Sequence, residues 1–375
     1  MEKTPGYIFF LLALLVMLSS CDKKEADSGN MSVLCPIEFG VTGYGAEVKA
    51  NELTSGNISG FGVFAALEPN DNDFLDNDAQ LSVFMDNVLV KKTGSLWQAD
   101  PVHYWPILQG KKLSFFAYAP YCDQEETLDA VADWDNRTIS LAYTLDADPK
   151  NQMDLCVANA VLDRRRDADG DGVDDPVEFN FDHTLTWVSF AANYIGDIPE
   201  GCTLQIDELT VSNVLNSNTL VGKFVGGALE WTWESPASAV RDGRYVMSRE
   251  SGIETLGNVP LEHRNQANDN HKDFQTARGY LYALPQTINP AGVSVPATLS
   301  LTFSYVRTDG SVIAQFFTEM NLPSEGVWEP RKKVKYIFTI DVTTASLIQL
   351  AAVSGGTWVT DWQASGNVHV DKEIR

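Results

Sequence analysis

The chain has 375 residues, of which 44% are hydrophobic, so it can bury a sizeable core and is not wholly disordered. A chain of this length predicts two domains rather than one. The 51 acidic residues outnumber the 27 Lys and Arg residues and give a formal net charge of −24. Such a surface repels polyanions, so nucleic acid is disfavoured as a partner.

The first 20 residues have the pattern of a bacterial lipoprotein signal peptide. The apolar run Tyr7–Leu18 is too short to span a bilayer, and its position is typical of a secretory signal. The sequence Leu-Ser-Ser-Cys that follows resembles a lipobox, in which the Cys becomes the first mature residue and carries the lipid. We therefore predict lipidation at Cys21, with residues 21–31 as a flexible tether. The alternative is a plain signal peptide with an incidental Cys.

Four further cysteines follow, at positions 35, 122, 156 and 202. An even number in an exported protein permits disulfides, and all three pairings remain open. No CxxC motif or Cys/His cluster is present in the spacing, so a zinc site is not expected. Cys156 lies in the apolar run Leu155–Leu162 and is predicted to be a buried free thiol.

The N-terminal half shows repeated period-two alternation and one candidate short helix, Glu125–Asp133. In the first expected strand, Met31–Val41, the apolar side chains share one face, and Pro36 indicates that it lies at a sheet edge or enters the sheet late. The acidic run Glu68–Asp78 is predicted to be an exposed loop. Other strands are expected at Gly60–Leu67, at Ser82–Lys92 and Ser95–Trp105 (a hairpin about a Thr-Gly turn), at Leu113–Tyr121, at Thr138–Tyr143 and at Leu155–Leu162.

An acidic loop near the middle of the chain fits the calcium-binding pattern D-x-D-x-D-G-x5-E. The predicted ligands, all of them oxygen atoms, belong to Asp167, Asp169, Asp171, Val173 (through its carbonyl), Asp175 and Glu178. The flanks are not the two helices of an EF-hand and Pro176 lies inside the loop, so a solvated acidic linker is the alternative. We predict a structural calcium ion in residues 167–178, between domains at residues 32–166 and 179–375.

The C-terminal half continues the strand pattern. Residues 179–194 are predicted to form one strand, bulged near Trp187, where the apolar phase changes by one residue. His183 lies on the apolar phase and is predicted to be a core histidine. A second phase change predicts another bulge between Cys202 and Val211. Later strands are expected at Tyr280–Leu284, Ala297–Tyr305, Val334–Val342 and Thr357–Gln363. Many short strands at this spacing predict an all-β chain of β-sandwiches.

Several of these segments together resemble the fimbrillin family, the lipoprotein-derived subunits of outer-membrane fimbriae called type V pili. The order and spacing of the motifs make the resemblance specific. It implies two transthyretin-like β-sandwich domains in tandem and a structural role at the outer membrane or in the fimbrium. The segments that carry it are Leu18–Cys21, Tyr104–Pro106 with Leu113–Tyr121, FNFDHTLTWVSF at 179–190, YLYALPQTI at 280–288 and WEPRKKVKYIFTIDV at 328–342.

The resemblance also implies how the chain meets its partners, which are other fimbrial subunits. In this family, stalk subunits lose an N-terminal strand to proteolysis, and a neighbour's C-terminal strand fills the groove by β-strand addition. The family's cut commonly follows an Arg, whereas Gly45–Ala50 (GAEVKA) offers only Lys49. Two interpretations stay open: a Lys-tolerant protease, or a retained strand that suits an anchor or tip subunit. The tail Gly366–Arg375 is the candidate donor strand.

The sequence does not predict an enzyme, because it has no G-x-S-x-G, no H-E-x-x-H and no phosphate-binding glycine loop. The alternative function is a lipid-anchored surface β-sandwich protein that binds a glycan or host ligand without forming fibres. Nine Trp residues offer aromatic faces for such a ligand. Among them, Trp231 and Trp233 are the best placed, because both rings lie on one face of a strand.

Overall fold

The computed structural model describes residues 34–42, 58–107, 111–167, 174–234, 240–248, 272–273, 281–322, 327–342, 350–351 and 358–361. All regular secondary structure in these ranges is β-strand, so the predicted all-β class is confirmed. None of the residues described belongs to a helix that is long and apolar enough to cross a membrane. The predictions for Cys21, for Lys49 and for the tail Gly366–Arg375 lie outside the described residues.

Seven strands form a closed ring in the order β2-β3-β4-β1-β10-β8-β5, with β5 pairing back to β2. A hydrophobic core made only of side chains from these strands and their flanks fills the ring. The predicted hairpin is confirmed as β3 and β4, which meet at Gly94 with a φ of 67°. The strands are β1 (Glu38–Thr42), β2 (Gly60–Glu68), β3 (Ser82–Thr93), β4 (Leu96–Asp100), β5 (Lys112–Ala119), β8 (Cys156–Ala158) and β10 (Val177–His183), with β9 (Val161–Arg164) attached to β5.

The prediction of one bulged strand over residues 179–194 is wrong. The segment forms β10, which ends at His183, and β11 (Thr186–Ile195), and these strands belong to different sheets. Between them, the Thr184 backbone N–H and hydroxyl both donate to the Leu155 carbonyl, at 3.0 and 2.6 Å. The change in apolar phase between Trp187 and Val188 falls inside β11, where both faces are buried and the register with β22 is continuous. It therefore marks neither a bulge nor the crossing between sheets.

Two sheets are built from the C-terminal part of the chain. In the first, of order β15-β12-β19-β20, the register of β12 against β19 shifts between Ile206 and Glu208, which confirms the second predicted bulge. Its strands are β12 (Cys202–Val214), β15 (Gly243–Ser248), β19 (Thr298–Arg307) and β20 (Val312–Asn321). The second has β11 parallel to β22 (Lys332–Asp341), with β16 (Lys272–Asp273), β17 (Leu281–Ala283), β23 (Leu350–Ala351) and β24 (Trp358–Asp361); β18 (Gln286–Thr287) pairs separately with β21 (Val327–Trp328).

A further sheet, of order β14-β13-β7-β6, joins strands from both halves of the chain. It combines β6 (Leu128–Asp133) and β7 (Thr138–Thr144) with β13 (Ser217–Val225) and β14 (Ala228–Trp233). Strands that precede the predicted loop at residues 167–178 thus pair with strands that follow it. The strand β10, which begins within the last residues of this loop, also pairs with the earlier strands β1 and β8. The predicted division into domains at this loop stays a prediction.

The helix predicted at Glu125–Asp133 is wrong, because Leu128–Asp133 forms β6. Along β6, Leu128 is buried and the next exposed and half-buried side chains alternate, which is the period of a strand. The pairing of β6 with β7 over all six of its residues decides the conformation. Local propensity is a weak guide for so short a segment, and tertiary pairing overrides it here.

Candidate functional site

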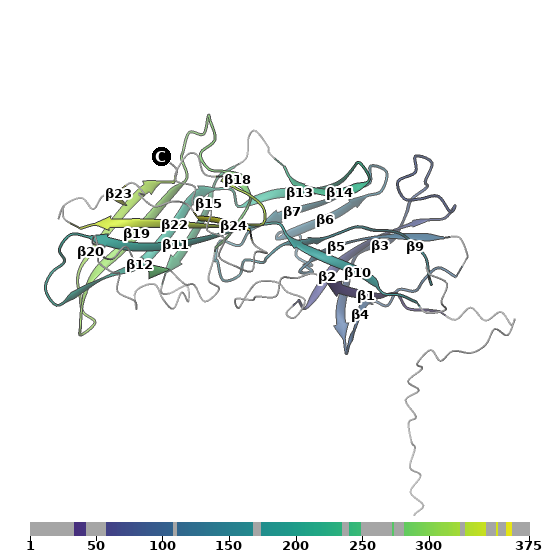
Figure 1. Cartoon of the computed structure of the whole chain (residues 1–375), viewed down its shortest axis with the longest axis horizontal. Helices are drawn as coiled ribbons and strands as arrows, with labels where there is room; N and C mark the ends of the chain where they lie inside the picture. Colours follow the sequence, from purple (N-terminus) through teal and green to yellow (C-terminus); the bar gives the residue numbers. More distant parts are fainter. Residues whose placement is uncertain are drawn as a thin grey trace, which may run out of the picture. The chain divides into compact units, whose positions relative to one another are not determined.

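The strand β1 closes the ring between β4 and β10 (Figure 1). It runs parallel to β10, with Phe39 opposite Val177, and antiparallel to β4, with Phe39 opposite Trp97. Of the two placements predicted for this strand, the late entry is correct: the strand begins at Glu38, after Pro36. Because β1 has a neighbour on each side, its removal would leave two strands with unpaired backbone groups.

Phe39 of β1 and Ile37, which precedes the strand, reach the centre of the ring. Ile37 and Phe39 are only 1% and 3% exposed, as the predicted apolar face requires. The ring of Phe39 stacks on Phe179, with 6.0 Å between centroids. It also makes edge contacts with Phe61 and Phe115, at 6.2 and 6.0 Å. A strand of five residues therefore supplies a central part of the ring's aromatic core.

The predicted calcium loop is described at its two ends only. Asp169, Asp171 and Val173 lie outside the described residues, so calcium binding stays a prediction. Asp167 has a φ of 48°, in the left-handed region. Asp175 is exposed and is therefore accessible to an ion.

The last residue of the calcium pattern, Glu178, lies in β10 opposite Gly40 of β1. Its carboxylate occupies the space where a side chain at position 40 would lie, because a Cβ built there would be 2.0 Å from Oε1. The absence of a side chain at Gly40 allows this close approach. Glu178 thus lies at the junction between the acidic loop and β1, a relationship that the sequence pattern does not contain.

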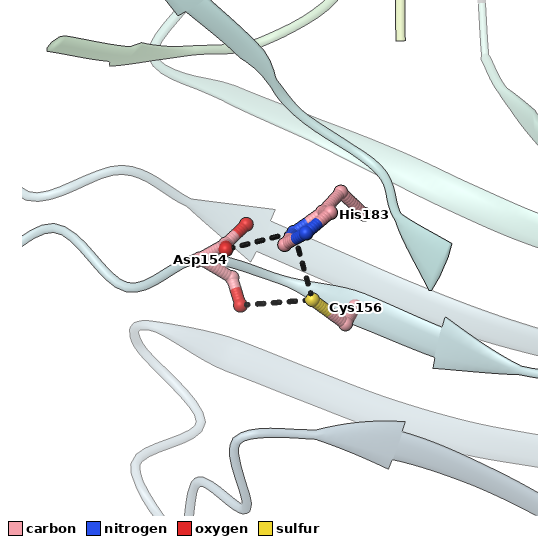
Figure 2. A group of neighbouring side chains, drawn as sticks. All are labelled: Asp154, Cys156 and His183. Atoms are coloured by element: carbon pink, nitrogen blue, oxygen red, sulfur yellow. Dashed lines mark hydrogen bonds and ion pairs between the residues drawn. The ribbon is translucent and has the colours of Figure 1, made fainter. Parts of the chain in front are cut away.

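Asp154, Cys156 and His183 form a buried polar cluster where β8 meets β10 (Figure 2). The antiparallel register places His183 directly opposite Cys156. The His183 Nδ1 atom lies 2.9 Å from Asp154 Oδ2 and 3.4 Å from Cys156 Sγ. The Asp154 carbonyl oxygen lies 3.7 Å from the same Sγ. All three residues are buried, so this is a polar site inside the core.

Sequence reasoning found two members of this cluster separately. The predictions that Cys156 is buried and that His183 is a satisfied core histidine are both confirmed. Their association was missed, because 27 residues separate them and only the β8–β10 register brings them together. A usable signal was the Asp-x-Cys spacing, since residues two apart in a strand lie on the same face.

The aromatic pair proposed for ligand binding packs against the ring instead. Trp233 is buried, and its Nε1–H donates to the Thr184 carbonyl at 2.9 Å. The Nε1–H of Trp231, which is half-buried, lies 3.4 Å from the Ala158 carbonyl. These contacts attach β14 to the ring and use the polar atoms of both indoles. Their place in the fold therefore favours a structural role for this pair.

Known proteins similar to this chain in sequence and in fold are fimbrial proteins. The chain matches the family described as Fimbrillin-like over residues 48–362. It is 24% identical over 348 residues to the fimbrium subunit Fim1C of Phocaeicola vulgatus, covering 86% of this chain and 88% of that protein. The crystal structure of a fimbrial protein from Bacteroides vulgatus is similar with a TM-score of 0.59 and 18% identity, covering 87% of this chain and 99% of that chain. Members of this family are structural subunits, which confirms the prediction that the chain is not an enzyme. The chain belongs to the fimbrillin-like family.

Proposed function

We propose that this protein is a structural subunit of outer-membrane fimbriae of the type V kind and that it joins its neighbours by β-strand addition. The place of β1 carries the proposal. This strand precedes every other described strand, lies between two neighbours and, with the preceding Ile37, fills the core through Phe39. Its removal would leave a slot with backbone donors and acceptors on both sides and pockets for alternate side chains. An incoming strand is recognised by just these features.

Two further parts of the proposal concern how the subunit is held and built. A lipid on Cys21 would anchor the precursor at the outer membrane, in keeping with the lipobox-like sequence. Two β-sandwich domains of transthyretin-like type would form the mature subunit. The glycan-binding alternative is not proposed, because the packing of Trp231 and Trp233 removes the best candidate surface for it.

Electron microscopy of cells that lack the gene tests the proposal directly. Loss of fibres from the cell surface, with their return when the intact gene is restored, is the expected result. Fibres of unchanged number and length would contradict the subunit role. A sharper test of β1 is complementation with the variant Phe39→Asp, which puts a charge at a buried position of β1. That variant should fail to restore fibres even where the precursor reaches the membrane.

Sequencing the N-terminus of the mature protein decides whether β1 is removed. A start near Ala50 would indicate cleavage at Lys49 and a stalk position that receives a neighbour's strand. A lipid-blocked start at Cys21 would indicate that β1 is retained, which suits an anchor or terminal subunit. The variant Lys49→Gln sharpens the result, because it should prevent the cleavage in the first case and change nothing in the second.

We also propose that calcium stiffens the acidic loop at residues 167–178. Isothermal calorimetry with millimolar calcium should show binding in the native chain, in the range of about 10⁻⁴–10⁻³ M that is typical of extracellular sites. The double variant Asp167→Ala with Asp169→Ala should lose it. The matched control, Asp123→Ala with Asp129→Ala, removes the same charge from exposed positions elsewhere. Absence of heat together with an unchanged melting temperature would contradict the proposal.

A further inference from the structure

We propose that Asp154, Cys156 and His183 form a binding site for a thiophilic divalent cation and that Zn²⁺ is the ion that fits it best. The three side chains offer one carboxylate oxygen, one sulfur and one imidazole nitrogen, which are the three donor types that proteins use for zinc. The donor atoms all lie within 4.8 Å of one another. A thiolate beside an imidazole favours zinc over calcium or magnesium, which take oxygen ligands.

The distances from His183 Nδ1 to the other two side-chain donors are close to the edges of a zinc tetrahedron. From ordinary zinc–ligand bond lengths, an N–O edge is about 3.4 Å and an N–S or O–S edge is about 3.6 Å. The observed distances from His183 Nδ1 are 2.9 Å to Asp154 Oδ2 and 3.4 Å to Cys156 Sγ. The Asp154 carbonyl oxygen, 3.7 Å from Sγ, supplies a fourth donor (Figure 2). The two distances from His183 Nδ1 differ from the corresponding edges by about 0.5 and 0.2 Å, and the three side-chain donors all lie within 4.8 Å of one another.

The fold holds these donors in place from two strands. Cys156 and His183 are directly opposed in the β8–β10 ladder, so the backbone fixes the separation of their side chains. Next to His183, both donors of Thr184 bond to the carbonyl of Leu155, which lies between Asp154 and Cys156. Rigid strands with hydrogen bonds beside the ligands give the pre-organisation that a metal site needs.

The charge of the loaded site suits its surroundings. Cys156 is fully buried, and the neighbouring Leu155 and Phe181 are 1% and 0% exposed. A buried charge is costly unless an opposite charge compensates it. One thiolate, one carboxylate, one neutral imidazole and one divalent ion sum to zero, so the loaded cluster buries no net charge. Loading requires the thiolate and releases the thiol proton to solvent.

Burial also determines how the ion enters. The His183 and Asp154 side chains are 7% and 1% exposed, so an ion reaches them during folding or when the strands open locally. The test therefore loads the metal during refolding. The purified protein is unfolded in a denaturant that contains a chelator, and the chelator is then removed. The protein is refolded with Co²⁺, which replaces Zn²⁺ and is visible by absorption. A thiolate-to-cobalt charge-transfer band, together with the visible bands of a tetrahedral ion, is the expected spectrum.

Two single substitutions assign the band to the site. Cys156→Ser should lose the charge-transfer band, and Cys122→Ser should keep it. Cys122 is the matched control, because it is also buried and its Sγ contacts the Gln124 carbonyl, 3.6 Å away and outside the cluster. Refolding with Zn²⁺ should raise the melting temperature of the native chain and of Cys122→Ser by about 5 °C or more, but not that of Cys156→Ser.

Two outcomes would overturn the site. A native protein that refolds without a charge-transfer band would show that the cluster is only a hydrogen-bonded part of the core. A band that persists in Cys156→Ser would place the metal elsewhere. If Cys156→Ser does not fold, ¹¹³Cd magnetic resonance of the native chain still decides. A cadmium shift typical of mixed sulfur, nitrogen and oxygen ligands supports the site, and a shift typical of oxygen ligands alone contradicts it.

Discussion

The seven-stranded ring and the sheet β15-β12-β19-β20 manage their edges in opposite ways. In the ring every strand pairs on both sides, so no strand of the ring is left as an edge. In the sheet, the only strand that pairs with β20 among the described residues is β19. The outer face of β20 carries Phe317, which is 67% exposed. In the part of the chain that the structure describes, the ring has no edge strand, whereas the sheet ends in β20, which carries an exposed aromatic ring.

The two regions also distribute their cores differently. The ring encloses aromatic side chains from several strands, among them Phe39 of β1 and Phe179 of β10. In the sheet, burial is one-sided at the edge: Phe316 of β20 stacks on Phe303 of β19 at 5.4 Å, while Phe317 faces outward. Loss of one strand should therefore open the whole interior of the ring. Loss of contacts at the edge of the sheet should remain local.

Removal of β1 is expected to have the largest effect. A chain that begins at residue 43 loses the buried Ile37 and Phe39 side chains, at a cost of about 5 kcal/mol or more in unfolding free energy. Thermal melting measures the loss. Adding a peptide of residues 34–42 in trans should restore the melting temperature, and the same peptide with Phe39→Asp should not. A truncated chain that melts like the full chain would contradict the role given to β1.

The substitution Phe179→Ala should be next in size. Phe179 is fully buried, and its ring contacts those of Phe39, Phe61 and Phe181. Truncation of a buried Phe costs about 3–5 kcal/mol, which denaturant unfolding would measure. Phe179→Leu is the matched control, because it keeps most of the buried volume and should cost much less. Equal losses for the two variants would mean that aromatic packing is not what the ring needs at this site.

The sequence is sufficient to place most strands and the buried face of β1, because alternation of apolar side chains is a local property. Closure of the ring was not predictable, since it depends on which strands pair, and one sequence does not reveal pairing partners. The same limit hid the cluster of Asp154, Cys156 and His183: His183 lies on β10, Cys156 begins β8 and Asp154 precedes that strand.

The acidic run Glu68–Asp78 shows a second limit, because its polar composition gave no sign that two of its side chains are buried. It was predicted to be an exposed loop, yet Phe74 is 1% exposed and its ring lies 5.4 Å from those of Phe116 and Phe224. Glu68 is also buried, and its carboxylate accepts the backbone N–H groups of Asn70 and Gln80 at 2.6 and 2.7 Å. Many acidic neighbours do not prevent burial of one aromatic ring and one well-bonded carboxylate.

The buried Tyr336, in β22, should make the free energy of unfolding depend on pH in the alkaline range. Burial raises the pKa of Tyr336 to about 12, and the hydrogen bond from Trp328 Nε1, 3.0 Å long, opposes the rise. In the unfolded chain the tyrosine hydroxyl ionises near pH 10. The stabilisation that comes from the raised pKa of Tyr336 is therefore fully present below pH 10 and is lost as the pH rises toward 12. The loss at this residue is about 2–3 kcal/mol.

Tyr336→Phe should therefore reduce the slope of unfolding free energy against pH between 10 and 12, as measured by denaturant unfolding at several pH values. Part of the slope should remain, because burial also raises the pKa of Tyr118, Tyr143 and Tyr245. Measurement at pH 7 serves as the control, since the difference between the two chains there reports only the lost hydrogen bond. Parallel pH curves for the two chains would show that Tyr336 ionises as easily in the folded state as in the unfolded one.

The smallest effect is expected at the open edge of the sheet. Phe317→Ser changes a side chain that is 67% exposed, so the free energy of unfolding should change by less than about 0.5 kcal/mol. Its neighbour Phe316 is the matched control, because it stacks on Phe303 and makes an edge contact with Tyr305, 5.0 Å away. Phe316→Ser should cost about 2 kcal/mol or more in denaturant unfolding. If the two substitutions proved equally costly, Phe317 would be covered in solution, and the outer face of β20 would then be a contact surface rather than an exposed one.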